Sequence, residues 1–144
     1  MRVLYDTSVL VPAFLANHAA HPLAFPQLEM AQREDIQGYL SAHSLAEFYA
    51  VTTRLPLPLR ISPGEAHATI SRFLKYLIPV ELSADDYWQA IARVNSLKLP
   101  GGVMYDAVVA QAALNVSVER LTTLNPRDFL RLGDEVSRLV HVPK

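Results

Sequence analysis

Short apolar runs alternate along the chain with longer stretches in which apolar and polar residues recur at the period of a helix. The apolar runs are too short for helices and are typical of strands buried on both faces of a sheet. This alternation favours βαβ units and an α/β fold, in which two helical layers sandwich a short, mostly parallel central sheet. We predict strands at Arg2–Tyr5, in the segment 38–44, which ends in a turn, and at Pro79–Leu82, Glu119–Thr123 and Arg138–Val142.

The stretches between these runs predict helices. The start signals are clearest at Ser62, which Glu65 follows three residues later, and at Ser83, which two acids follow in the first turn. Loops are predicted in the segment 18–22 and where proline or glycine clusters, as after Leu55. The predicted helices are Thr7–Asn17, Leu23–Ile36, Ala46–Arg54, Ser62–Leu77, Ser83–Leu97 and Met104–Val116.

Length and composition are those of one globular domain, which we expect to span residues 1–144. Hydrophobic residues make up 51% of the chain and charged residues 19%, which is enough for a sizeable core. The 13 basic and 14 acidic side chains give a net charge of −1. This balance is unlike the large positive excess of proteins that coat nucleic acid, although it leaves room for a local basic rim.

The chain contains no cysteine, which excludes disulfides, thiolate metal sites and cysteine nucleophiles. It shows no recognisable signal peptide and no apolar run of the roughly 18 residues that cross a bilayer. We therefore expect a cytoplasmic protein without a membrane partner.

A carboxylate interrupts the first apolar run, because Asp6 stands in the segment VLYDTSVLV directly after the first predicted strand. Ligands of open parallel sheets bind outside the carboxyl ends of the strands, so Asp6 stands where a site would lie. The structural alternative is that Asp6 or Thr7 caps the following helix, since both residue types are common at that position. The sequence around Asp6 alone leaves both interpretations open.

Glu47 stands among apolar residues in the segment SLAEFYAV, so we expect its helix to be buried or to face a pocket. This acid also has a structural alternative. Ser44 and Glu47 have the spacing of a capping box, in which the glutamate reaches back to the start of the helix.

Asp106 lies at the N-terminal end of an apolar helix face that continues through Val109, Ala110 and Ala113. A helix N-terminus favours an anion. An unpaired charge on a buried face is nevertheless costly, and a bound cation would remove that cost.

One shared cation explains the three acids more simply than three separate capping roles. Clustered carboxylates repel one another and resist ionisation. Mg²⁺ and Mn²⁺ reverse this effect and prefer oxygen ligands. We therefore expect Asp6, Glu47 and Asp106 to be ligands of a Mg²⁺ site that Mn²⁺ can also fill.

The segments LYDTSVLV, SLAEFYAVTTRLP, YDAVVAQAAL and LTTLNPRDF resemble, in order and spacing, the motif blocks of PIN-domain ribonucleases. They are most similar to those of the VapC-type toxins of type II toxin–antitoxin pairs. The resemblance spans nearly the whole chain and implies a PIN-like fold. It places the acids of the family at Asp6, Glu47 and Asp106.

The resemblance also implies residues that complete the site. The hydroxyls of Ser8 and Thr123 would support the first acid. Many relatives have aspartate where this chain has Asn125, which keeps an oxygen ligand but adds no charge. Asp128 is then an alternative fourth ligand, and its structural alternative is to cap the short helical turn before Phe129.

The implied activity is Mg²⁺-dependent hydrolysis of phosphodiester bonds in tRNA, rRNA or mRNA by a toxin that inhibits translation. The implied partners are a cognate antitoxin protein and a second copy of the chain in a homodimer. Candidate RNA contacts are His21, Arg54 and Arg127, and the structural alternative for each is an ordinary exposed side chain.

Two other functions stay open. Asn125 in place of an acid would suit a PIN-like RNA-binding module with weak catalysis. Asp6 after the first strand would suit an aspartate-dependent phosphatase. The haloacid-dehalogenase-like pattern of such phosphatases has a second aspartate two residues later, where this chain has Ser8.

Overall fold

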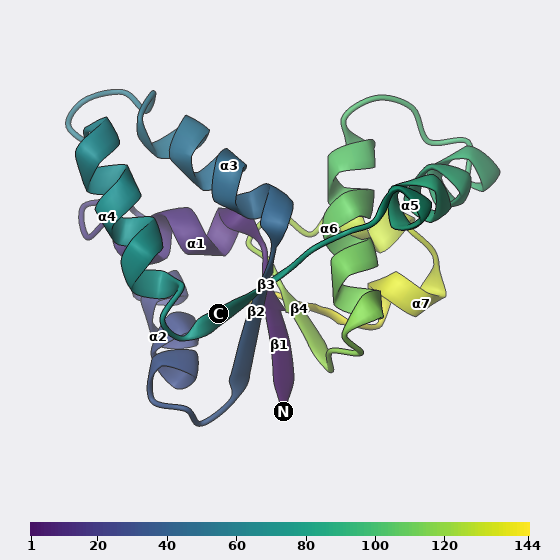
Figure 1. Ribbon diagram of the computed structural model, residues 1–144, viewed down its shortest axis with the longest axis horizontal. Helices are drawn as coiled ribbons and strands as arrows, with labels where there is room; N and C mark the ends of the chain where they lie inside the picture. Colours follow the sequence, from purple (N-terminus) through teal and green to yellow (C-terminus); the bar gives the residue numbers. More distant parts are fainter.

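Strand β1 (Arg2–Tyr5) runs through the middle of the molecule and is buried on both faces (Figure 1). The computed structural model describes residues 1–144. Because successive side chains of a strand point to opposite faces, Leu4 enters one hydrophobic core while Val3 and Tyr5 enter the other. This double burial explains why the strand is apolar at consecutive positions.

The sheet has five strands in the order β3-β2-β1-β4-β5, and every neighbouring pair is parallel. The predicted α/β fold with a short central sheet is confirmed, and the sheet is parallel throughout. The chain moves outward from β1 to β3 and then returns to the other side of β1, so the strand order reverses between β1 and β4. Besides β1, the strands are β2 (Gln37–Ser41), β3 (Leu77–Val80), β4 (Arg120–Thr122) and β5 (Val140–His141).

Helices cover both faces of this sheet, with α1 to α4 on one side and α5 to α7 on the other (Figure 1). The first group is α1 (Thr7–Phe14), α2 (His21–Gln32), α3 (Ala42–Thr52) and α4 (Pro63–Phe73). The second group is α5 (Ala84–Ser96), α6 (Val103–Asn115), the short 3₁₀ helix η1 (Phe129–Arg131) and α7 (Asp134–Ser137). None of these helices has the length and apolar character needed to span a bilayer.

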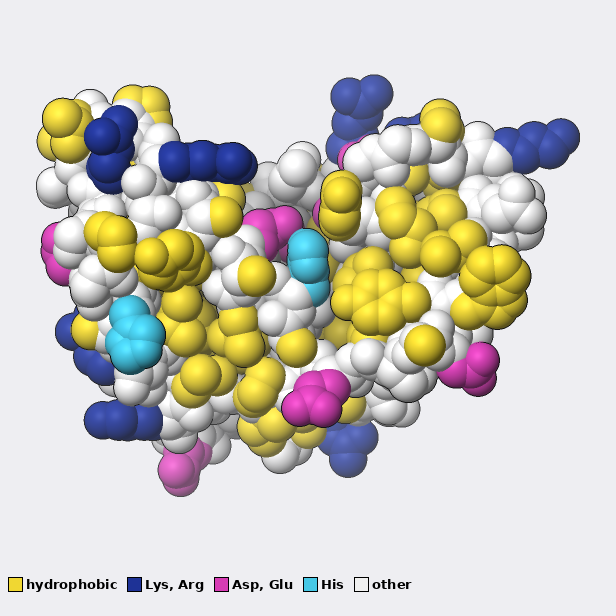
Figure 2. Space-filling model, turned by 45° about the horizontal axis from the view of Figure 1, so that its top comes forward, with side chains coloured by type: hydrophobic (Ala, Val, Ile, Leu, Met, Phe, Trp, Pro, Cys, Tyr) yellow, Lys and Arg dark blue, Asp and Glu magenta, His cyan; other side chains and the backbone are white.

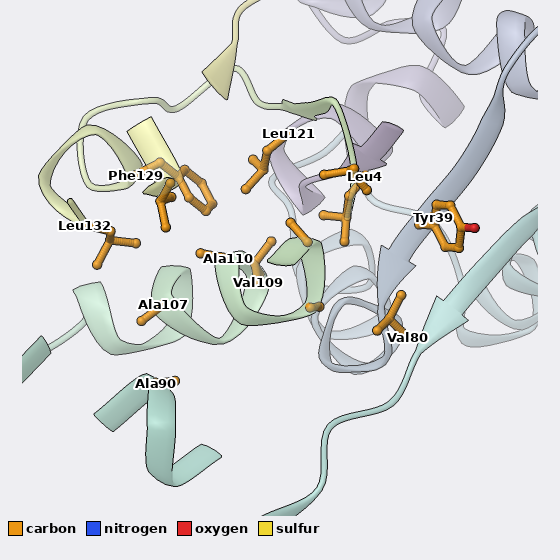
Figure 3. Packing of buried hydrophobic residues seen from close by; sticks show 14 of the residues in the cluster. Leu4, Tyr39, Val80, Ala90, Ala107, Val109, Ala110, Leu121, Phe129 and Leu132 are labelled. Atoms are coloured by element: carbon orange, nitrogen blue, oxygen red, sulfur yellow. The ribbon is translucent and has the colours of Figure 1, made fainter. Parts of the chain in front are cut away.

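The core between α6 and the sheet is drawn in Figure 3. Leu4 and Leu121 of the strands and Phe129 of η1 are fully buried there. Their partners on α6 include Val109 and Ala110, which belong to the helix face predicted to start at Asp106. The buried face of α6 is rich in alanine, which packs against the strands in the same core.

Gly38 of β2 marks the closest packing on the opposite face. A Cβ atom on Gly38 would lie 2.6 Å from Leu77 Cδ2 and 2.8 Å from Ala31 Cβ of α2. Both distances are shorter than real Cβ contacts, so any side chain here would push α2 away from the sheet.

The observed boundaries differ from the predicted ones at several ends. Helix α1 ends at Phe14, and α2 begins at His21 because a proline is tolerated in its first turn. Strand β3 starts two residues earlier than predicted, since α4 ends at Phe73. The sequence prediction contained η1 only as a short helical turn next to Phe129, and it did not contain α7. The helix starts at Ser62 and Ser83 are confirmed, and each carries a complete capping box.

Candidate metal-dependent active site

A pocket of about 580 Å³ opens at the carboxyl ends of β1 and β4, between the two helical groups. Figure 2 shows this face, with acidic side chains in a central hollow and Lys or Arg side chains on both sides of it. The pocket lies at the point where the strand order reverses, which is where open parallel sheets bind ligands. Its polar lining includes Asp6, Ser8, Glu47, Asp106 and Asn125.

Asp6 is the most buried acid of the pocket, with 6% of its surface exposed. Its Oδ2 accepts hydrogen bonds from Ser8 Oγ at 2.7 Å and from Thr123 Oγ1 at 2.8 Å. Asp6 stands at the N-cap position of α1, but its side chain makes no capping hydrogen bond. The carboxylate is therefore held mainly by two hydroxyls, both on Oδ2, and a backbone hydrogen bond from Thr7 also stabilises its charged form.

The two supporting hydroxyls also tie the end of β4 to the start of α1. Ser8 Oγ accepts the backbone N–H of Leu124 at 2.9 Å, and Thr123 Oγ1 accepts that of Asn125 at 3.0 Å. Each hydroxyl has a single hydrogen, which it donates to Asp6. The two hydroxyl oxygens lie 3.1 Å apart, but neither has a hydrogen left to donate to the other, so this is a close contact and not a further hydrogen bond. This network fixes both the position of Asp6 and its rotamer.

Burial raises the pKa of Asp6, because the ionised carboxylate loses its hydration. The hydrogen bonds from Ser8 and Thr123 oppose this rise, and the negative charge of Glu47 adds to it. The site thus holds an acid whose charge is only partly compensated by the protein itself.

Glu47 lies in the second turn of α3, because this helix starts at Ala42 and not at Ala46 as predicted. Ser41 is the N-cap and accepts the backbone N–H of His43 at 3.3 Å. Ser44 is thus a buried residue inside the helix, and the capping-box interpretation of Ser44 and Glu47 is wrong. The Glu47 carboxylate is free to line the pocket, with its Oε2 3.5 Å from His43 Nε2.

Asp106 lies in the first turn of α6 and enters the pocket from the side opposite Glu47. Its pKa is raised to about 7, first by burial and then by the negative charges of Asp6 and Asp128, with Glu47 contributing least. Asp106 therefore belongs to a cluster of mutually repelling carboxylates whose members come from distant parts of the chain.

These features agree with comparisons to known proteins. The PIN domain family model matches residues 3–135. Ribonuclease VapC27 of Mycobacterium tuberculosis is 34% identical over 117 residues, which cover 81% of this chain and 80% of that protein. Ribonuclease VapC40 of the same species is 34% identical over 119 residues, which cover 81% and 82%. The chain belongs to the PIN domain family.

Solved structures place this PIN domain among folds of the VapC type. VapBC2 of Rickettsia felis, bound to a promoter DNA fragment, superposes with a TM-score of 0.71 at 18% identity over all of both chains. Mycobacterium tuberculosis VapC20, described as a sarcin-ricin loop cleaving toxin, gives 0.70 at 16% identity over 88% of this chain and 92% of that one. A toxin–antitoxin complex from Klebsiella pneumoniae gives 0.59 at 20% identity over 88% and 89%. These similarities confirm the predicted PIN-like fold.

The structure of this PIN domain brings most of the predicted site residues together, but not all of them. Asn125 lines the pocket, while Asp128 is outside the lining, raises the pKa of Asp106 and pairs with Arg131 at 3.1 Å. Asp128 makes no capping hydrogen bond to η1, so its capping alternative is wrong. Arg54 and Arg127 are exposed and lie outside the pocket lining.

His21 is not among the residues that line the PIN-domain pocket. Its Nδ1 is 2.8 Å from the carbonyl oxygen of Pro12, and its ring stacks on Phe25. His18 lines the pocket instead. Both histidines are visible in the sequence. Which of them lines the pocket depends on the start of α2 at His21, which the sequence did not predict.

Tyr105 and Thr7 are among the lining residues that the sequence did not predict. Tyr105 lines the pocket beside Asp106, and its only signal was that adjacency. Thr7 lines it as well, and its buried Oγ1 has no hydrogen-bond partner within the chain. Thr7 therefore does not cap α1.

The donor atoms of this PIN domain suit a hard divalent cation. No three His, Asp or Glu side chains lie close enough together to hold a metal ion by themselves. Mg²⁺ does not require this, because it is commonly held by one or two carboxylates and keeps several waters. The negative charge of Asp6 contributes to the raised pKa of Asp106, a repulsion that a cation between the two carboxylates would relieve.

Proposed function

We propose that this PIN domain is a Mg²⁺-dependent endoribonuclease, the toxin of a toxin–antitoxin pair that inhibits translation, with Asp6, Glu47 and Asp106 as its catalytic carboxylates. The observation that carries the proposal is the convergence of these three acids in one pocket at the switch point of the sheet. Two relatives that are 34% identical carry the name ribonuclease, which supports the same activity.

The side chains divide the work between holding a cation and placing the substrate. Asp6, fixed by Ser8 and Thr123, and Asp106 from the opposite side would hold the metal, with Glu47 and Asn125 within the same pocket. A bound Mg²⁺ would neutralise phosphate charge and lower the pKa of a water for in-line attack. No side chain has to serve as a covalent nucleophile, because water attacks the phosphodiester.

An acidic pocket needs positive charge nearby to attract RNA. Basic side chains stand on both sides of the hollow in Figure 2, and Arg54 and Arg127 are exposed. Such a rim would contact the phosphates that flank the cleaved bond, while the pocket itself takes the cation. This arrangement reconciles a net charge of −1 with a polyanionic substrate.

A cognate antitoxin is the proposed protein partner. This part of the proposal is supported by the structural similarity to VapBC2 and to the Klebsiella pneumoniae toxin–antitoxin complex. A homodimer is the proposed assembly of the toxin itself, and sedimentation of the purified chain would measure it.

The nuclease proposal is tested by incubating the purified protein with total RNA in Mg²⁺ or in EDTA. We expect cleavage in Mg²⁺ and none in EDTA. Asp6→Asn should lower the rate by at least about 100-fold, since even the outer partners of metal ligands cost 10- to 100-fold when removed. Asp35→Asn is the matched control, because Asp35 is exposed and outside the pocket.

Two results would contradict the proposal. Cleavage by Asp6→Asn at the wild-type rate would exclude the carboxylate site. RNA binding by the wild-type protein without cleavage would favour the catalytically weak RNA-binding module, for which Asn125 is the supporting residue.

A further inference from the structure

An aromatic ring stands at the mouth of the pocket with much of its surface free. Tyr105 is 61% exposed and lines the pocket one residue before Asp106. It belongs to neither hydrophobic core, and its hydroxyl makes no hydrogen bond within the chain. Neither packing nor hydrogen bonding within the fold therefore accounts for a large aromatic side chain at this position.

One face of the Tyr105 ring is backed by His43. The two ring centres are 5.7 Å apart and the planes are nearly parallel, at 9°. This stack joins α3 to α6 across the pocket, because the two residues come from the first turns of these helices. The Tyr105 ring is therefore exposed to solvent but held in place by its stacking on His43.

The same histidine connects the ring to the acids. His43 Nε2 lies 3.5 Å from Glu47 Oε2, one helical turn further along α3. Tyr105 is adjacent to Asp106 in the sequence, so both ends of the stack are fixed to candidate catalytic residues. A ligand that covers Tyr105 would therefore enter the same pocket as the three acids.

We infer that the Tyr105 ring, supported by His43, is a stacking platform for one unpaired base of the RNA next to the cleaved bond, an inference that rests on the proposed function. Proteins that bind single-stranded RNA place unstacked bases on exposed aromatic rings. The platform selects for flexible single-stranded RNA, because a base inside a duplex has no free face to offer. His43 is a positioning residue, which holds the ring parallel to the base.

Binding of a fluorescein-labelled single-stranded oligoadenylate tests the platform, with an abasic ribose-phosphate oligomer of the same length as the second probe. Both are titrated in EDTA, and a gel confirms that the RNA stays intact. Tyr105→Ala should weaken oligoadenylate binding by about 5- to 100-fold, the range measured for loss of base stacking, and leave the abasic probe unaffected. Tyr105→Phe and Tyr105→Trp should bind the oligoadenylate as the wild type does.

Tyr87→Ala is the matched control, because Tyr87 is an exposed tyrosine of α5 outside the pocket. His43→Phe should retain oligoadenylate binding, while His43→Ala should weaken it. Circular dichroism of each variant separates loss of folding from loss of stacking.

The inference is overturned if Tyr105→Ala binds the oligoadenylate like the wild type, or if it loses both probes equally. Equal losses in Tyr105→Phe and Tyr105→Ala would also overturn it, since the hydroxyl would then matter and not the ring. The nuclease proposal fails separately, through absence of RNA cleavage by the wild-type protein in Mg²⁺. A protein that binds RNA through Tyr105 but does not cleave it would keep the platform and lose the nuclease.

Discussion

Asp6 shows how a single residue can have two plausible roles in the sequence and one in the structure. It stands at the N-cap of α1, where aspartate is common, yet it makes no cap. The two hydroxyl donors that hold it, Ser8 and Thr123, are 115 residues apart in the chain. Only the pairing of β1 with β4 brings Thr123 to Asp6, so no local pattern around Asp6 contains that information.

Asp106 gives a prediction about pH and stability. Its pKa of about 7 lies above the ordinary value of 3.8, so proton binding stabilises the folded state. That contribution is complete below about pH 4 and is lost as the pH rises through about 7. Asp106→Asn should therefore be more stable than the wild type in EDTA at high pH, by on the order of 1 kcal/mol after allowance for solvent screening.

Urea denaturation across this pH range measures the effect of Asp106→Asn. The advantage of the variant should grow between about pH 4 and about pH 7 and then stay constant. Asp35→Asn should show no such trend. If Asp106→Asn were less stable than the wild type at high pH, the fold would stabilise the ionised carboxylate of Asp106, which contradicts its raised pKa.

The acids of the pocket were predictable at the residue scale, and most of the remaining lining was not. Asp6, Glu47 and Asp106 each stand beside a strand end or a helix start, and carboxylates at such places are visible in a sequence. Tyr105 and His18 line the same pocket because of how α6 and the loop before α2 are placed. A tyrosine or histidine in an amphipathic segment carries no signal of that placement.

At the scale of elements, helix α3 shows how one capping residue sets the position of a functional side chain. Two serines three residues apart, Ser41 and Ser44, both offer a start signal. The structure uses Ser41, because β2 ends there and its side chain meets the N–H of His43. The short helix α7 was missed because a single turn has too few residues to show a helical period.

Gly38 gives a prediction at this scale. Gly38→Ala should destabilise the fold by about 1 to 3 kcal/mol, because the new methyl group overlaps Leu77 and Ala31 and forces α2 from the sheet. Urea denaturation compared with the wild type measures the loss.

Gly64→Ala is the control for Gly38→Ala, since its Cβ would meet only Ser62 Oγ at 4.0 Å within a helix that favours alanine. We expect it to be neutral or stabilising. If Gly38→Ala were as stable as Gly64→Ala, α2 would not be packed against β2 as closely as the structure has it.

On the scale of the whole molecule, the sheet divides the pocket between two halves of the chain. Asp6 and Glu47 belong to the half with α1 and α3, and Asp106 belongs to the half with α6. The two hydrophobic cores lie on opposite faces and share only the strands. A cation bound by both Asp6 and Asp106 would therefore connect the two halves at the carboxyl end of the sheet, where the two carboxylates line the same pocket.

The central claim is that carboxylates from both halves act as one metal site, and calorimetric titration with Mn²⁺ tests it most directly. The wild-type protein and Asp35→Asn should bind Mn²⁺ with equal affinity. Asp6→Asn and Asp106→Asn should each weaken binding by at least about 10-fold, because each removes a charged ligand. Wild-type affinity in either of these two variants, or no binding by the wild type, would contradict the account.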